Sequence, residues 1–413
     1  MTGGAEPDLV VVGAGAAGLM AAIWAARSAP QRRVVLVDGA RVLGAKILVS
    51  GGGRCNVTHH AVDERDFNGS SPAAIRKVLR RFDVPRTIAF FRDLGVELRR
   101  EETGKLFPVT DRARTVLDAL VAAARAAGVV VRHPWRVSAV AREPAGFVLT
   151  SDAGAVIRTP RLVLASGGRS LPKTGSDGGG YALAQALGHS LTPRIFPGLV
   201  PLTLAEGHFI RALSGLSVPA TLEVRAASGR KRAVGTGSLL CTHFGLSGPA
   251  ALDVSRHYLD AQMDEPSARL VVRWIPDETA ESLDGALRDL GTATVGGLLG
   301  QRLPERLARA LCAHAGVDPA TPGHRLSRSA RRAIAEAAAE MPVPVTGDRG
   351  YAFAEVTAGG VPLRELDLAT LRSRLAPGLS LCGEICDVDG RIGGFNFQWA
   401  WSSGYVAGTG AWA

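Results

Sequence analysis

The stretch DLVVVGAGAAG, residues 8–18, decides the fold of this 413-residue chain. It starts with a short β-branched run, which is typical of a strand buried in a parallel sheet. Three glycines follow, and then an Ala-rich stretch through Arg27 that we expect to be helical. A second β-branched run begins at Val34 and ends in Asp38, which lies 20 residues past Gly18. This order of strand, tight turn, helix, strand and acid is the fingerprint of a dinucleotide-binding unit.

Each residue of this fingerprint has a physical reason. Gly13 permits the turn, Gly15 lets the backbone approach a pyrophosphate, and Gly18 allows close packing of the helix. The phosphates are expected at the helix N-terminus near Ala16, where free N–H groups and the helix dipole favour an anion. Asp38 is expected to accept a hydrogen bond from the adenosine ribose. The sequence therefore predicts a binding site for FAD or NAD.

A second Gly-rich stretch favours FAD over NAD. The stretch VSGGGRCN, residues 49–56, follows Asp38 closely, where a simple NAD domain usually continues into another crossover helix. In flavoproteins of the two-dinucleotide type, the segment after the ribose acid folds back over the cofactor. Glycine suits such an approach, because it also reaches backbone conformations that are closed to other residues. We therefore expect the following residues to contact the cofactor: Lys46, Ser50, Gly51, Gly52, Gly53, Arg54, Cys55 and Asn56.

Composition places the chain among ordinary globular proteins. Its length allows two or three domains at about 150 residues each, and 46% of its residues are hydrophobic. The apolar stretch from Leu9 to Ala26 follows acidic residues and is interrupted by glycines, so we expect a cytoplasmic protein without signal peptide or membrane span. Five scattered cysteines predict neither a disulfide framework nor a metal site. The net charge of +10, nearly all from arginine, permits a nucleic-acid partner without requiring one.

Seven segments, in order, resemble one family. This family is the BaiN-like (YhiN-type) FAD-dependent oxidoreductases of bacteria, with its ribosomal RNA dihydrouridine synthases. The resemblance extends over nearly the whole chain. The segments are GAGAAG (13–18), KILVSGGGRCN (46–56), EETGKLFPV (101–109), LASGGRSLPKTGS (164–176), THFGLSGPA (242–250), VTAGGV (356–361) and CGEICDVDGRIGGFNFQWAWSSGYVAG (382–408).

The resemblance and the residue pattern together imply an α/β fold. A Rossmann-like FAD-binding domain of the two-dinucleotide type is expected at residues 1–188 and 361–413. An inserted β-rich domain is expected at 189–275, with return strands at 342–360. The Ala/Leu/Arg-rich region 276–341 is expected to be a small helical cap.

The resemblance also implies further contacts to a non-covalent FAD. One strand ends in small residues that suit a nucleotide, and another ends in the acid that commonly holds the ribityl chain. A helix near the C-terminus is expected to point its N-terminus at the flavin pyrimidine edge. The residues are Val137 at the adenine, Ala165, Ser166 and Gly167 at the first strand end, Gly383 and Glu384 at the second, and Gly393, Gly394, Phe395 and Asn396 at the helix.

The family resemblance suggests an activity and leaves alternatives. NAD(P)H is expected to reduce FAD, which then reduces a polarised carbon–carbon double bond, with a uridine of large-subunit ribosomal RNA as the preferred substrate. Because the chain has no second dinucleotide fingerprint, NAD(P)H is expected to bind transiently. The alternative enzyme acts on a small molecule, as an amine oxidase or an enone or steroid reductase. The non-enzyme alternative is a flavin-bound RNA-binding or redox-sensing module.

Two residues are candidate proton donors for such a reduction. Cys55 lies in the second Gly-rich stretch, and a packing role suits it equally, since thiols bury readily. His243 lies in THFGLSGP, where an ordinary structural role competes with that of an acid or orienting group. The basic runs 76–81, 230–232 and 331–332 are usually solvated faces. If RNA is the partner, charge reversal at 230–232 is expected to weaken binding.

Overall fold

The first quoted stretch forms the central strand of a parallel sheet in the computed structural model, which describes residues 6–413. The sheet has the order β21-β11-β1-β2-β7, and its four pairings are all parallel. β1 and β2 are fully buried, as expected for Val- and Leu-rich strands covered on both faces. The strands are β1 (Leu9–Val12), β2 (Val34–Val37), β7 (Val130–Arg132), β11 (Leu162–Leu164) and β21 (Leu379–Leu381).

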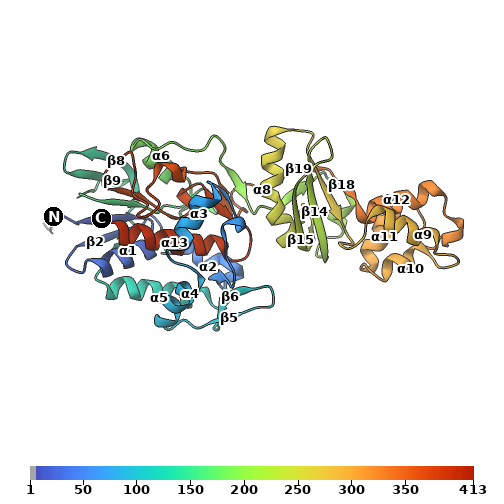
Figure 1. Cartoon of the computed structure of the whole chain (residues 1–413), viewed down its shortest axis with the longest axis horizontal. Coiled ribbons are helices and arrows are strands. Elements are labelled where there is room, and N and C mark those ends of the chain that lie inside the picture. The colour runs from blue at the N-terminus through green and yellow to red at the C-terminus, as the bar shows by residue number, and fades with distance from the viewer. Residues whose placement is uncertain (1–5) are drawn as a thin grey trace. The chain divides into compact units, whose positions relative to one another are not determined.

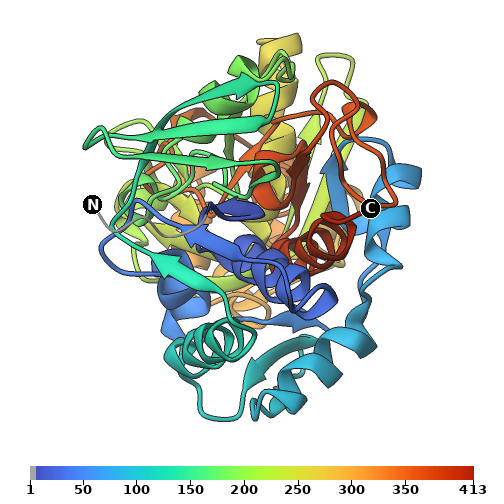
Figure 2. The same ribbon diagram turned by 90° about the vertical axis from the view of Figure 1, so that its left-hand side faces the viewer.

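Two helices from opposite ends of the chain lie side by side (Figure 1, Figure 2): α1 (Ala16–Ser28) and α13 (Phe395–Gly410). A Cβ at Gly404 would lie 2.5 Å from the carbonyl oxygen of Ala17, and one at Gly408 would lie 2.4 Å from that of Ala21. The missing side chains therefore let the two backbones touch. From the first contact to the second, the chain advances four residues toward the C-terminus in both helices. The two helices therefore run parallel.

Shorter elements complete this first unit, which comprises the described residues through Pro197 together with Glu355–Ala413. An antiparallel meander, β8-β9-β10, precedes β11 and was not predicted from the sequence. The other elements include short strands and helices around the second Gly-rich stretch. Their bounds are α2 (Ala45–Val49), η1 (Ser50–Gly53), β3 (Thr58–His59), η2 (Glu64–Asp66), β4 (Phe67–Gly69), α3 (Pro72–Leu79), α4 (Val84–Asp93), β5 (Leu98–Arg100), β6 (Lys105–Pro108), α5 (Ala113–Ala126), β8 (Val137–Glu143), β9 (Gly146–Ser151), β10 (Val156–Thr159), η3 (Pro172–Thr174), α6 (Gly179–Ala186), β12 (Phe196–Gly198), β20 (Val356–Ala358), η5 (Leu363–Glu365), η6 (Gly383–Ile385) and β22 (Val388–Gly390).

The second unit, Gly198–Ala354, is built on a seven-stranded antiparallel sheet. Its order is β18-β17-β14-β15-β16-β13-β19, with α8 packed on β14 and β15 and four further helices beyond β17. The bounds are β13 (Leu202–Leu204), α7 (Phe209–Ala212), β14 (Ser217–Arg225), β15 (Lys231–Thr242), β16 (Gly245–Ser247), α8 (Gly248–Asp264), β17 (Arg269–Arg273), α9 (Ala280–Arg288), α10 (Val295–Gly300), α11 (Glu305–His314), η4 (Gly323–Arg325), α12 (Arg328–Ala339), β18 (Met341–Val343) and β19 (Val345–Asp348).

The predicted α/β fold, a Rossmann-like unit with an additional antiparallel domain, is confirmed. The domain boundaries expected at residues 189, 276, 342 and 361 stay predictions. None of the helices within residues 6–413 combines the length and the hydropathy that crossing a bilayer requires.

Candidate functional site

The three glycines of the first turn have different surroundings. A Cβ at Gly13 would lie 2.5 Å from the carbonyl oxygen of Ala165, and one at Gly18 would lie 1.7 Å from the carbonyl oxygen of Gly13. Gly15 differs, because its backbone is extended (φ −79°, ψ −169°) and a Cβ there would meet no atom of residues 6–413 within 4 Å. Packing within the protein therefore accounts for Gly13 and Gly18, whereas Gly15 borders open space at the start of α1.

The N-terminal end of α1 suits an anion. Gly15 begins the helix without a side-chain cap from any described residue, and the first turn carries no acidic side chain. The first N–H groups of a helix have no intrahelical partner and attract negative charge. Asp38 braces the turn, since its carboxylate accepts hydrogen bonds of 2.6 Å from the N–H groups of Ala14 and Ala40. A carboxylate oxygen can accept two hydrogen bonds and each oxygen of Asp38 accepts one here, so Asp38 retains capacity for a ribose hydroxyl.

Because the two helices are parallel and α13 begins earlier along their shared axis, the N-terminus of α13 extends past the N-terminus of α1. Gly404 is level with Ala17, so Phe395 lies roughly 13 Å further along the shared direction at 1.5 Å per residue. α13 begins at Gly394, also without a side-chain cap from the described part of the chain. A Cβ at Gly383 would lie 2.7 Å from the Ala17 side chain, so the end of β21 also reaches the start of α1. Two such N-termini suit a long ligand with a phosphate group near one of them.

The second Gly-rich stretch forms a tight turn. Gly51, Gly52 and Gly53 have φ values of 55°, 69° and 86°, and Cys55 has 61°. L side chains rarely adopt such conformations, so the backbone alone favours glycine at these three positions. A Cβ at Gly51 would also lie 3.0 Å from the backbone nitrogen of Asn56, whereas one at Gly52 would meet no described atom within 4 Å. The turn itself explains the glycine run, and of the three glycines Gly52 faces open space.

The polar residues after these glycines have different partners. The Arg54 guanidinium donates to Glu101 at 2.6 Å and lies 3.7 Å from Asp111. It also lies over the ring of Phe107, 3.9 Å from the centroid, so the protein itself holds this arginine. Asn56 is buried, and its side-chain oxygen has no hydrogen-bond partner among residues 6–413. Asn56 is therefore the better placed of the two for a polar contact with a ligand.

Cys55 is fully buried in the core of the first unit. Burial raises the pKa of its thiol to about 12, although a hydrogen bond with Ser50 acts in the opposite direction. A thiol with this pKa stays protonated at neutral pH and is neither a strong acid nor a nucleophile. This environment suits the packing role of Cys55.

Glu384 and Lys46 form a polar network, although they lie 338 residues apart in the chain. The Lys46 ammonium donates to one carboxylate oxygen of Glu384 at 2.6 Å and to the Ser170 hydroxyl at 2.5 Å. The other carboxylate oxygen accepts from the Ser170 hydroxyl and from the Thr357 backbone N–H, each at 2.8 Å. Ser170 and Thr357 were not predicted as site residues, although both lie in segments that carry the family resemblance. The network fixes the orientation of Glu384, which stays partly exposed.

The strand end at Ala165–Gly167 lies against the first turn through the carbonyl group of Ala165. Ser166 and Ser176 each bury a hydroxyl that has no hydrogen-bond partner in the described part of the chain. Buried polar atoms without partners are rare in proteins, and a ligand or water commonly completes such sites. Val137 begins β8 and pairs with Ser151 of β9.

The segment before α13 is shaped by two glycines with positive φ. Gly393 has a φ of 130° and Gly394 a φ of 95°. Asn396 pairs its side-chain amide with the backbone N–H and carbonyl of Gly390, each at 2.8 Å. Phe395 is buried beside this turn. The side chains of Phe395 and Asn396 thus fix the turn, which leaves its backbone as the part available to a ligand.

His243 belongs to the second unit, on the turn between β15 and β16. The Thr242 hydroxyl bonds the carbonyl of Gly245 at 3.0 Å and accepts from its N–H at 3.1 Å, which closes the turn. Arg211 donates to the carbonyl oxygen of His243 at 2.7 Å. The backbone of His243 is therefore held, while its side chain is exposed.

The first unit fits a flavin dinucleotide. Gly15 leaves open space beside an uncapped helix N-terminus, and a second uncapped N-terminus lies roughly 13 Å further along. Around them, three buried polar side-chain atoms lack a partner within residues 6–413, in Asn56, Ser166 and Ser176. A ligand with phosphate, ribityl and ring carbonyl groups supplies partners both for the uncapped helix N-termini and for these buried polar atoms.

Known proteins match nearly the whole length of the chain. The family model described as HI0933-like protein Rossmann domain matches residues 7–410. A 3-dehydro-bile acid delta(4,6)-reductase of Clostridium scindens is 34% identical over 406 residues, covering 97% of this chain and 98% of that protein. A ribosomal RNA dihydrouridine synthase of Escherichia coli is 34% identical over 402 residues, covering 97% and 96%. Among solved structures, a chain of E. coli quinol fumarate reductase matches with a TM-score of 0.54 at 17% identity, covering 98% of this chain and 70% of that one.

The family match and these relatives define the class of protein as a FAD-dependent oxidoreductase. The chain belongs to the HI0933-like family.

Proposed function

We propose that the chain reduces a polarised carbon–carbon double bond with electrons from NAD(P)H, and that its substrate is a uridine of ribosomal RNA. The reaction class is supported by two relatives with different named substrates, because a delta(4,6)-reductase and a dihydrouridine synthase both saturate a double bond conjugated to a carbonyl. The RNA substrate is supported by the net charge of +10, since cationic side chains attract phosphates.

In this proposal the first unit binds FAD. The backbone at Gly15 and the N-terminus of α1 hold the diphosphate, and Asp38 holds the adenosine ribose. The oriented Glu384 carboxylate accepts hydroxyl groups of the ribityl chain. The N-terminus of α13 favours negative charge on a nearby ring. When bound, FAD supplies hydride transfer between the nicotinamide donor and the double bond.

Reduction also needs a proton, and His243 and Cys55 are the candidate donors. We favour His243, because its side chain is exposed, whereas burial raises the pKa of the Cys55 thiol to about 12. His243→Ala should retain FAD and its reduction by NAD(P)H, yet slow substrate reduction by about a hundredfold or more. Cys55→Ala should slow it far less. Stopped-flow measurement of the two half-reactions separates these effects, and parent rates in both variants would eliminate both donors.

The substrate is tested by anaerobic incubation of purified protein and NAD(P)H with an unmodified ribosomal RNA transcript. The expected result is dihydrouridine in the digested nucleosides, detected by mass spectrometry. A steroid with a conjugated enone is offered in parallel, because the equally full-length match to the bile-acid reductase favours this second candidate. Saturation of the steroid without any dihydrouridine would replace the RNA substrate by the steroid class. Oxidation of an amine alone would contradict both.

A further inference from the structure

We propose that a basic face on α3 and the turn after it, formed by Lys77, Arg80 and Arg81, binds backbone phosphates of the RNA substrate. This inference rests on the proposed function and adds the surface that docks the RNA. The three residues are exposed and belong to the first unit.

The basic runs 76–81, 230–232 and 331–332 differ in their ion pairs. In the run 230–232, Lys231 and Arg232 pair with carboxylates, and in the run 331–332 Arg331 does the same. Charges that are already paired contribute less to the attraction of a distant anion. The pairs are Lys231–Glu223 (2.7 Å), Arg232–Asp264 (3.3 Å), Arg232–Glu265 (3.5 Å) and Arg331–Asp284 (3.3 Å).

In the run 76–81, most of the cationic side chains have no ion pair with a described carboxylate. Arg76 pairs with Glu64 at 3.2 Å, but Lys77, Arg80 and Arg81 have no carboxylate within 4.0 Å among residues 6–413. The nearby acids of η2 and its cap are engaged elsewhere, because Asp63 pairs with Arg65 and Asp66 pairs with Arg391. The acid that follows Arg81 in the chain, Asp83, caps α4 by accepting the N–H of Arg86 at 3.1 Å. A cluster of unpaired cations therefore remains on this face.

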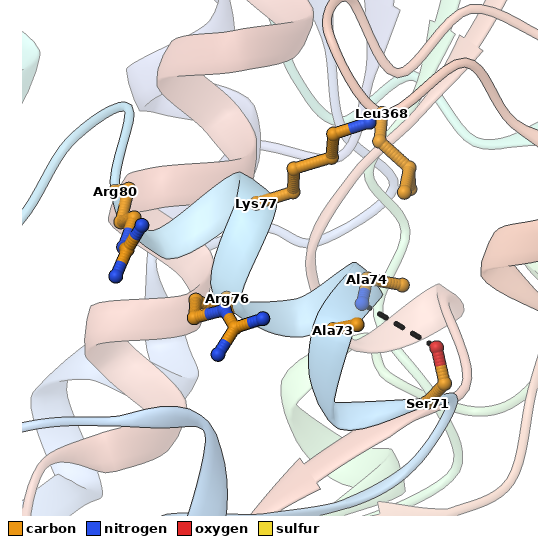
Figure 3. Close-up of a pocket in the computed structure, with 7 residues that line it drawn as sticks. All are labelled: Ser71, Ala73, Ala74, Arg76, Lys77, Arg80 and Leu368. Carbon is orange, nitrogen blue, oxygen red and sulfur yellow. Dashed lines mark hydrogen bonds between the residues drawn. The ribbon is translucent and has the colours of Figure 1, made fainter.

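The same face is hollowed. A hollow of about 440 Å³ lies beside α3, and Figure 3 shows the Lys77 side chain extending from α3 toward Leu368. Small residues and flexible cations around a hollow suit the phosphates and sugars of a single strand, which a positively charged groove tracks. The lining residues are Ser71, Ala73, Ala74, Arg76, Lys77, Arg80 and Leu368.

The test compares two variants that lose the same charge. The α3 variant is Lys77→Gln, Arg80→Gln, Arg81→Gln, and the control is Arg230→Gln, Lys231→Gln, Arg232→Gln. In the control, the buried Glu223 keeps its pair with Arg225 at 2.5 Å. Affinity for an unmodified ribosomal RNA transcript is measured over a range of salt concentrations. FAD absorbance and flavin reduction by NAD(P)H report that both variants fold.

The α3 variant should bind RNA at least about tenfold more weakly, and the slope of log affinity against log salt should fall by about 2, because each single-strand phosphate contact contributes about 0.7. The control should lose much less of both affinity and slope. The run 230–232, which the sequence alone offered as an RNA contact, is therefore expected to contribute little, because Lys231 and Arg232 are already paired with carboxylates. Equal losses in the two variants, or no loss in the α3 variant, would overturn the proposed surface. A parent protein that binds anionic phospholipid vesicles through these residues, and not RNA, would also overturn it.

The inference and the proposed function fail in different ways. If the parent protein forms dihydrouridine and the α3 variant binds RNA like the parent, only the docking surface is wrong. If the parent neither binds nor modifies RNA but saturates the steroid enone, the proposed function itself is wrong.

Discussion

The two Gly-rich turns of the first unit use glycine for different reasons. In the first turn, Gly13 and Gly18 are required because a Cβ would collide with backbone atoms, while Gly15 has an ordinary extended conformation and open space around it. In the second turn, Gly51, Gly52 and Gly53 are favoured because their φ values are positive. A glycine that neither packing nor conformation requires is the one that points to a ligand, and Gly15 is that glycine.

Gly18→Ala should have the largest effect on stability. The new Cβ would lie 1.7 Å from the carbonyl oxygen of Gly13, and backbone atoms cannot move aside cheaply. Overpacking of this kind typically costs 1–3 kcal/mol, and we expect about 3 kcal/mol or more here. Urea denaturation of the apoprotein measures the loss. Gly15→Ala is the matched control, and an unchanged midpoint for Gly18→Ala would contradict the packing argument.

Gly15→Val should abolish FAD binding without unfolding the protein. An extended backbone accommodates valine, so the apoprotein should lose about 1 kcal/mol or less. The side chain would occupy the space proposed for the diphosphate, and FAD affinity should fall by at least about a hundredfold, or about 2.7 kcal/mol. Fluorescence titration of the apoprotein with FAD gives the affinity. Binding at the parent affinity would place the diphosphate elsewhere.

Two substitutions at Gly52 separate conformation from contact in the second turn. Gly52→Ala should destabilise the protein by about 1–2 kcal/mol, because alanine is strained at a φ of 69°. Gly52→Asn should cost less, since asparagine tolerates this region. If the flavin needs bare backbone at Gly52, both variants lose FAD affinity. If only the asparagine variant binds FAD like the parent, the positive φ alone explains why glycine occupies position 52.

The smallest expected effect concerns the thiol that closes the second turn. Burial raises the pKa of Cys55 from about 9 to about 12, so between these values the folded state holds a proton that the unfolded chain has released. The stabilisation is complete below about pH 9 and is lost as the pH rises. Because of this difference in bound protons, the free energy of unfolding should fall by about 1 kcal/mol from pH 9 to pH 10. Cys55→Ala should flatten the alkaline fall in the unfolding free energy by that amount, and an identical pH profile would contradict the buried state of the thiol.

The fold was predictable because its signals are local. The β-branched run of β1, the glycine spacing and Asp38 lie within one short segment, and each acts through its own backbone conformation or nearest neighbours. The antiparallel meander β8-β9-β10 was missed, although β9 alternates buried and partly exposed residues as a half-buried strand does. The signal is weak because the strand that pairs with β9, β8, is mostly exposed and shows no such alternation.

The candidate site was predictable only in outline. The sequence identified Glu384 and Lys46 separately, but their 2.6 Å ion pair joins residues 338 positions apart and brings in Ser170 and Thr357. For the glycines of the second turn, the sequence suggested approach to a flavin, whereas the positive φ values give a sufficient reason within the chain itself.

Motif spacing was enough to predict a Rossmann-like dinucleotide-binding unit, because a strand, a glycine turn and a helix are encoded in consecutive residues, and the resemblance of seven segments to one family implied a FAD-dependent oxidoreductase. They were not enough to distinguish one basic run from another. The arginines and lysines at 76–81 and at 230–232 look alike in the chain, and only the packed structure pairs Lys231 with Glu223 while it leaves Lys77 unpaired among residues 6–413. The reason is physical: the charge that a partner meets depends on which carboxylates lie within a few ångströms, and tertiary packing brings those together from distant parts of the sequence.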